Sequence, residues 1–119
     1  MGNNEDAIGY FEQQLLTLEP LTTSLAILDK VRALSNLGDC FEALGDTHEA
    51  LKCHEQELAG AIQLQSVKDQ EKAYGGLGRA KEAAGYLHEA LVCFEKRLLA
   101  AHEVDTPESR GTAYGDLGE

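Results

Sequence analysis

Apolar and small side chains recur along the chain with the spacing of an α-helix. Between residues 24 and 44 they stand at positions 34, 37, 41 and 44, at intervals of three and four. This spacing predicts an amphipathic helix. Comparable patterns predict helices over roughly 47–65, 68–84 and 87–104. We therefore expect an all-α protein with no strands, in which about three quarters of the residues are helical.

The helical pattern repeats every 40 residues. When residues 31–70 are aligned with residues 71–110, 14 positions are identical, and the run from His48 to Leu51 recurs whole from His88 to Leu91. A further copy begins at Ala113. Self-similarity at such a period is typical of proteins built from stacked helical repeats.

The copies divide the chain into units of two helices each. We expect one array over residues 1–119, with a partial repeat at 2–22, full repeats at about 24–64 and 67–104, and a partial repeat at 106–119. The first copy is offset by 43 residues, which predicts three extra residues in the loop around 19–23. Because both ends fall inside a repeat, we expect the sequence to be a piece of a longer array.

Turn residues support this division. Gly45 and Gly85 stand between the two helices of each full unit, where a left-handed residue commonly ends a helix. Asp46, followed by Glu49, resembles a capping box at the start of a second helix. Thr106, followed by proline and glutamate, is a strong helix start.

The first full unit carries a bulky residue, Leu-Gly and an aromatic residue on its first helix, glycine at the turn and alanine on its second helix, and the second full unit matches these residue types except at position 81. These residues are Leu34, Leu37, Gly38, Phe41, Gly45 and Ala50, then Tyr74, Leu77, Gly78, Lys81, Gly85 and Ala90. The pattern resembles the tetratricopeptide repeat family, from which Lys81 departs at the aromatic position. The 40-residue period exceeds the 34 residues common in that family and is similar to the arrays of the Pins/LGN G-protein-signalling modulators.

The resemblance implies a right-handed α-solenoid of antiparallel helix pairs. It also implies a cytoplasmic, non-catalytic adaptor that binds segments of partner proteins and is linked to cell division and the cytoskeleton. In such arrays the first helices line the concave face.

Small residues predict where the two helices of a unit approach most closely. We expect Gly38, Gly78 and Gly118 at these contacts, with Ala50 and Ala90 facing them from the second helix. A larger side chain there would overpack the contact, at a cost of roughly 1–3 kcal/mol.

Composition and charge exclude several classes of function. With 119 residues, 43% of them hydrophobic, the chain has the make-up of one soluble domain. The net charge of −11 disfavours nucleic acid and anionic membranes as partners, because both require basic side chains to neutralise phosphates.

No apolar run is long enough to span a bilayer, and residues 1–20 lack the features of a signal peptide. Three widely spaced cysteines indicate a reducing, cytoplasmic compartment.

No catalytic or metal-binding motif stands out. His48 and His88 occupy one repeat position that is expected at the surface, and Cys53-His54 lacks a second pair at zinc-site spacing. The glycines at 75, 76 and 78 neither follow a strand nor precede the Lys-Ser/Thr of a phosphate loop. Cys53 and its repeat partner Cys93 are expected to be small buried residues. We expect no enzyme activity, no cofactor and no metal.

The expected function is the binding of an extended segment or a helix of another protein in the concave groove. By position, the residues pointing into this groove are Arg32, Ser35, Asn36, Asp39, Glu42, Lys72, Gly75, Gly76, Arg79, Glu82, Thr112, Gly115 and Asp116. Arg32, Lys72 and Arg79 form a basic line, and arginine binds carboxylates bidentately, so an acidic partner segment is favoured. The small residues would leave room for bulkier partner groups. Alternatively, the groove charges pair with one another.

Two other functions remain open at this stage. In the first, the chain is a self-assembling spacer: the helix at 107–119 of one molecule packs head to tail on the helix at 3–18 of the next. In the second, it is a regulatory module of a larger signalling protein. A clamp for a C-terminal carboxylate is disfavoured, because only parts of its Lys and Asn pattern are present.

Overall fold

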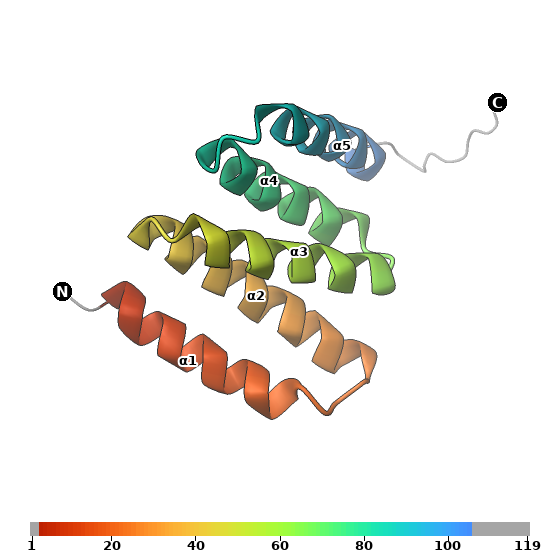
Figure 1. Cartoon of the computed structure of the whole chain (residues 1–119). Helices are drawn as coiled ribbons and strands as arrows, with labels where there is room; N and C mark the ends of the chain where they lie inside the picture. The colour runs from red at the N-terminus through yellow and green to blue at the C-terminus, as the bar shows by residue number, and fades with distance from the viewer. Residues whose placement is uncertain (1–2, 106–119) are drawn as a thin grey trace.

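The structure, a computed structural model, describes residues 3–105, which form five α-helices and no strand (Figure 1). The helices are α1 (Asn3–Leu18), α2 (Ser24–Leu44), α3 (Thr47–Gln63), α4 (Val67–Ala83) and α5 (Leu87–Asp105). These bounds confirm the predicted helices to within two residues, and the loop predicted around 19–23 joins α1 to α2. The helix predicted at 107–119, with its cap at Thr106, lies outside the described residues.

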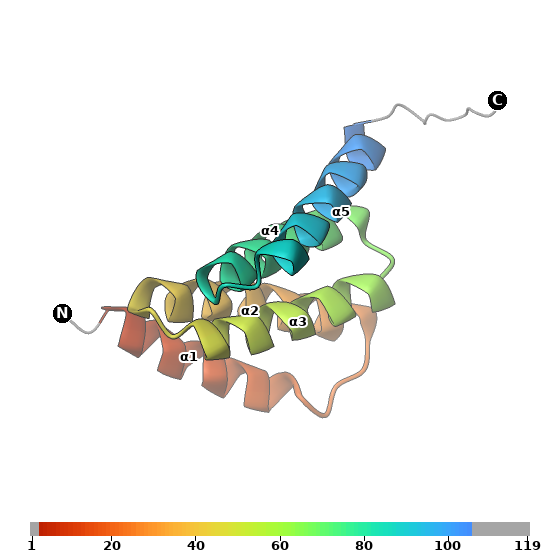
Figure 2. The same cartoon turned by 45° about the horizontal axis from the view of Figure 1, so that its top comes forward.

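The five helices form a helical repeat solenoid. Each helix packs antiparallel against the next one along the chain, and α2 also contacts α4 directly. No Cα pair within 8 Å joins α1 to α4 or α5 among these helices. Figure 2 shows α1 and α5 on opposite sides of the stack. The contacts are therefore those of stacked neighbours, as in a repeat array, and not those of a closed bundle.

The core consists largely of small side chains, which let the helices approach closely. Ala50, Ala61, Ala73 and Ala80 are fully buried. At one end of the core, Leu34, Leu37 and Cys53 form a cluster, covered by partly buried residues that include Phe11 of α1 and Phe41 of α2.

The two repeat-related cysteines are buried, as predicted. Burial raises the pKa of the Cys53 thiol to about 11, and nearby carboxylates add to this effect. Because only the thiolate is a good nucleophile or metal ligand, Cys53 is a packing residue at neutral pH.

The predicted turn glycines are confirmed at both positions. Gly45 ends α2 with φ of 82°, and Gly85 follows α4 with φ of 91°, both in the left-handed region. The next residue in each turn donates its backbone N–H to the carbonyl five residues before it. Asp46 then caps α3, because its side chain accepts a hydrogen bond from the backbone N–H of Glu49.

Lys81 shows how the second full unit compensates for its missing aromatic residue. Its ammonium group donates to Glu89 on α5 at 2.6 Å, and the Lys81 side chain is largely buried. This hydrogen bond raises the pKa of Lys81. A charged contact therefore joins α4 to α5 at this position.

Candidate functional site

The structure places the predicted groove residues on α2 and α4, but not all of them are accessible. Arg32, Asn36 and Asp39 on α2 are exposed, as are Lys72, Arg79 and Glu82 on α4, and Glu42 is half-buried. Ser35, Gly75 and Gly76 are buried. Thr112, Gly115 and Asp116 lie outside the described residues.

A polar cleft brings the predicted basic line together. The cleft has a volume of about 410 Å³ and runs from α2 across α4 to α5. It is lined by Arg32, Lys68, Asp69, Glu71, Lys72, Gly75, Arg79 and Arg97. Five cations thus face two carboxylates, in a chain whose net charge is −11.

Two of these cations are absent from the sequence-based prediction. Lys68 lies one turn before Lys72 on α4, so helical spacing alone could have found it. Arg97 comes from α5, a second helix of a unit, and its side chain lies against Gly75. No sequence signal assigns a residue of a second helix to this cleft.

The cations of the cleft differ in how they are paired. Arg79 lies 3.4 Å from Asp39 and 3.3 Å from Glu42, as measured between Nη2 and the carboxylate oxygens. Among the side chains that the structure describes, those of residues 5–102, Arg32 and Lys72 have no ion-pair partner. Internal pairing of the groove charges therefore holds for Arg79 but not for the other two. The Arg79 pairs are about half exposed, so each contributes under about 1 kcal/mol.

The expected room for a partner beside the small residues is absent at Gly76. A Cβ atom built at Gly76 would lie 2.6 Å from the imidazole ring of His54. At Gly75, a Cβ atom would lie 3.3 Å from the Arg97 side chain. The His54 ring fills the space over Gly76, so this glycine leaves no room for a bulky partner group, whereas Gly75 lines the cleft beside the exposed Arg97 side chain. Ser35 is 3% exposed and likewise cannot reach a partner.

The predicted glycine–alanine contact also needs correction. The atoms nearest a Cβ built at Gly38 belong to the His54 ring, at 2.7 Å, and those nearest one at Gly78 belong to the Phe94 ring, also at 2.7 Å. The close approach at both glycines was predicted correctly. However, the side chains that occupy these contacts are the rings of His54 and Phe94, each one helical turn after the predicted alanine.

His54 is the residue that sequence reasoning missed. It lies on α3 between Gly38 of α2 and Gly76 of α4, and it is only 1% exposed. Its Nδ1 is 2.8 Å from a carboxylate oxygen of Glu57, which is equally buried. Its Nε2 has no hydrogen-bond partner within the described part of the chain and lies 3.8 Å from Asp39 Oδ1. The available sequence signal was the alignment of His54 with Phe94 and Phe11.

Comparison with known proteins gives one match. Residues 33–68 match the family model described as tetratricopeptide repeat. This match supports the tetratricopeptide repeat family. The matched segment starts within α2, includes all of α3 and ends at the beginning of α4. No curated protein and no solved structure matches the chain.

Tetratricopeptide repeats generally mediate contacts between proteins and generally have no catalytic role. The match therefore connects the solenoid to protein binding as a class of function. A separate observation concerns membranes: none of the helices described is both long and apolar enough to cross a bilayer.

Proposed function

We propose that this chain is a non-catalytic, cytoplasmic scaffold that binds an acidic segment of a partner protein in the cleft between α2, α4 and α5. The observation that supports the proposal most directly is the gathering of five cations around one cleft of a strongly acidic chain. Arg32, Lys68 and Lys72 are available there, since they have no ion-pair partner among the described side chains of residues 5–102. Positive potential in a concave site attracts and orients carboxylates.

A variant with two reversed charges tests this proposal. Arg32→Glu combined with Lys72→Glu is expected to weaken binding of a fluorescein-labelled peptide rich in aspartate and glutamate by about tenfold or more, because like charges then face each other. Fluorescence anisotropy measures the affinity at two salt concentrations. Both residues are exposed, so the fold should persist, which circular dichroism verifies.

The matched control reverses two exposed lysines outside the cleft, Lys52→Glu and Lys96→Glu, and so makes the same change in net charge. It should leave most of the affinity intact. Equal losses in the two double variants would mean that overall charge governs binding, and an unaltered Arg32→Glu/Lys72→Glu variant would show that the cleft is not the binding site.

The assignment to a subclass is also part of the proposal. The 40-residue period supports full repeats at about 24–64 and 67–104, with partial repeats at 2–22 and 106–119. In this respect the chain resembles the Pins/LGN modulators and tetratricopeptide repeat protein 28. On that resemblance it would act as an adaptor linked to cell division and the cytoskeleton, or as a regulatory module of a larger signalling protein.

Self-association is a second candidate function, favoured by the apolar surface of α5. Leu87, Leu91 and Leu98 are each at least 60% exposed. Their spacing of four and seven places them on one helix face. Such a face can pack on another copy of the chain. The head-to-tail contact expected from the sequence involves other residues, the helix at 107–119 of one molecule and the helix at 3–18 of the next.

Light scattering coupled to size exclusion tests the second candidate. We expect a molar mass that rises with protein concentration, because a head-to-tail contact does not close. Leu91→Glu with Leu98→Glu should hold the mass at that of one chain. Leu25→Glu, at an exposed position near the start of α2, is the control and should still associate. A constant monomer mass for the unaltered chain would rule this candidate out.

A further inference from the structure

The aromatic ring that packs over the glycine of a first helix is histidine in one repeat and phenylalanine in the next. His54 aligns with Phe94 at an offset of 40 and with Phe11 at an offset of 43. Phe94 packs over Gly78 just as His54 packs over Gly38. Because packing requires only a flat ring here, the imidazole introduces two buried polar atoms without improving the contact. Burying polar atoms costs free energy unless they are paired, which raises the question of what Nε2 binds.

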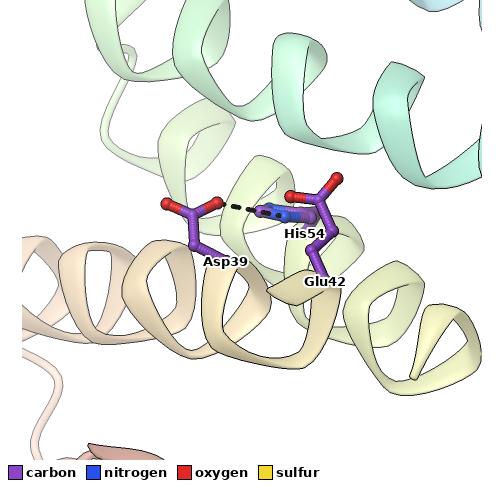
Figure 3. A group of neighbouring side chains, drawn as sticks. All are labelled: Asp39, Glu42 and His54. Atoms are coloured by element: carbon purple, nitrogen blue, oxygen red, sulfur yellow. Dashed lines mark ion pairs between the residues drawn. The ribbon is translucent and has the colours of Figure 1, made fainter. Parts of the chain in front are cut away.

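We propose that Asp39, Glu42 and His54 form a binding site for a divalent transition-metal ion, with Zn²⁺ as the best-fitting ion. Among the described side chains, those of residues 5–102, they form the only group of three or more metal-ligating residues whose donor atoms converge, all within 4.8 Å of one another. Figure 3 shows the two carboxylates, which both come from α2, beside the imidazole of His54 from α3. This inference does not depend on the proposed peptide binding.

The distances suit a small ion. His54 Nε2 and Asp39 Oδ1 are 3.8 Å apart. In a tetrahedral zinc site with bonds of about 2.0–2.1 Å, neighbouring donor atoms are roughly 3.4 Å apart. All three donor atoms lie within 4.8 Å of one another, so the two carboxylates must approach by at most about 1.4 Å to reach this spacing, and their partial exposure permits the movement. The fourth position would be open to water.

Glu57 holds the imidazole in the orientation and tautomer that a metal ligand requires. When Glu57 is ionised its carboxylate only accepts hydrogen bonds, and the His54 nitrogen facing it, Nδ1, then carries the hydrogen. The lone pair is then on Nε2, which is buried, has no hydrogen-bond partner and faces Asp39 and Glu42. Metal-binding histidines commonly donate their other ring N–H to a carboxylate in this way.

The donor set determines the class of ion. Imidazole nitrogen is a preferred ligand of zinc, copper, iron and nickel, whereas magnesium and calcium favour sites made of oxygen alone. One nitrogen and two carboxylates fit a divalent transition metal. Zn²⁺ is the reference ion because it accepts mixed nitrogen and oxygen ligands without a demanding geometry.

Arg79 competes with the ion for the two carboxylates. Its guanidinium group contacts both Asp39 and Glu42 from α4. A bound cation would have to share these carboxylates with Arg79 or displace it. Replacing Arg79 with glutamine removes a positive charge next to the site, so this variant should bind Zn²⁺ more tightly than the unaltered chain.

Calorimetric titration of the untagged 119-residue chain with ZnCl₂ tests the proposal. We expect one saturable site in the unaltered chain. Asp39→Asn and Glu42→Gln should each weaken zinc binding by about tenfold or more. Glu57→Gln should weaken it by about tenfold, because Glu57 orients the ligand His54. Arg79→Gln should tighten it. Millimolar Mg²⁺ should not compete.

Glu82→Gln is the matched control. Glu82 lies 40 residues after Glu42, at the equivalent position of α4, and the residue 40 positions after His54 is Phe94, which cannot bind a metal. The two glutamine variants change the net charge equally, yet only Glu42→Gln should lose zinc affinity. Equal effects of Glu42→Gln and Glu82→Gln would overturn the site, as would the absence of any saturable binding.

Histidine NMR separates this site from adventitious binding at other imidazoles. Zn²⁺ should shift the Nε2 resonance of His54 while leaving the resonances of the other three histidines, His48, His88 and His102, in place. Shifts confined to these three would overturn the proposal. This measurement uses the unaltered chain, so it tests the site even if substitutions of the metal-binding residues disturb the fold.

Discussion

Replacement of Gly38 with leucine is expected to destabilise the solenoid by about 3 kcal/mol or more, at the upper end of the cost of overpacking a core. Even a single Cβ atom at this position would lie 2.7 Å from the His54 ring. The ring cannot move aside easily, because Gly76 lies on another side of it and Glu57 binds its Nδ1. The side chain of leucine would therefore force α2 away from α3.

Thermal unfolding followed by circular dichroism measures the effect, and we expect the midpoint to fall by about 10 °C or more. Gly9→Leu is the control, because a Cβ atom at Gly9 on α1 meets no atom within 4 Å. That variant should be at least as stable as the unaltered chain, since leucine is a better helix former than glycine by under about 1 kcal/mol. Similar midpoints for Gly38→Leu and the unaltered chain would contradict the close contact seen between α2 and α3.

The features that the sequence predicted well depend on residues close together in the chain. A helix boundary depends on its own capping residues, as Gly45 and Asp46 show at the turn between α2 and α3. The spacing of apolar residues likewise reports one helix at a time. For these reasons the five helices and their turns could be placed to within two residues.

The residue that meets Gly38 could not be predicted in this way. Ala50 and His54 are four residues apart, so they lie on the same face of α3. Which of them meets Gly38 depends on how far α3 is shifted along its axis relative to α2, and the periodicity of either helix contains no information on that shift. The buried His54–Glu57 pair was missed for the same reason.

The sequence predicted only some of the residues that line the cleft, and there is a physical reason why it missed Arg97. Register along α2 and α4 was enough to group Arg32, Lys72 and Arg79. Arg97 belongs to α5, and it reaches the cleft only because Gly75 has no side chain in its way. A long, flexible side chain from a neighbouring layer cannot be located from the spacing of residues within one helix.

Replacement of His54 with phenylalanine is expected to destabilise the chain by about 3–5 kcal/mol, although phenylalanine occupies the aligned positions 11 and 94. The ring itself should fit, since Phe94 packs over Gly78 in the same manner. The cost arises at Glu57, which is 1% exposed and would lose the hydrogen bond to His54 Nδ1. A buried carboxylate without a partner is among the most costly arrangements in a protein interior.

A double-mutant cycle distinguishes this cause from a simple misfit of the ring. Glu57→Met alone leaves the Nδ1–H of His54 without an acceptor and should cost about 1–3 kcal/mol. The double variant His54→Phe/Glu57→Met removes both polar partners, so it should recover most of the stability lost in His54→Phe. Urea unfolding of the four proteins gives the coupling free energy. If the double variant were instead less stable than His54→Phe, the ring and not the stranded carboxylate would be at fault, and the role of Glu57 in holding His54 would have to be abandoned.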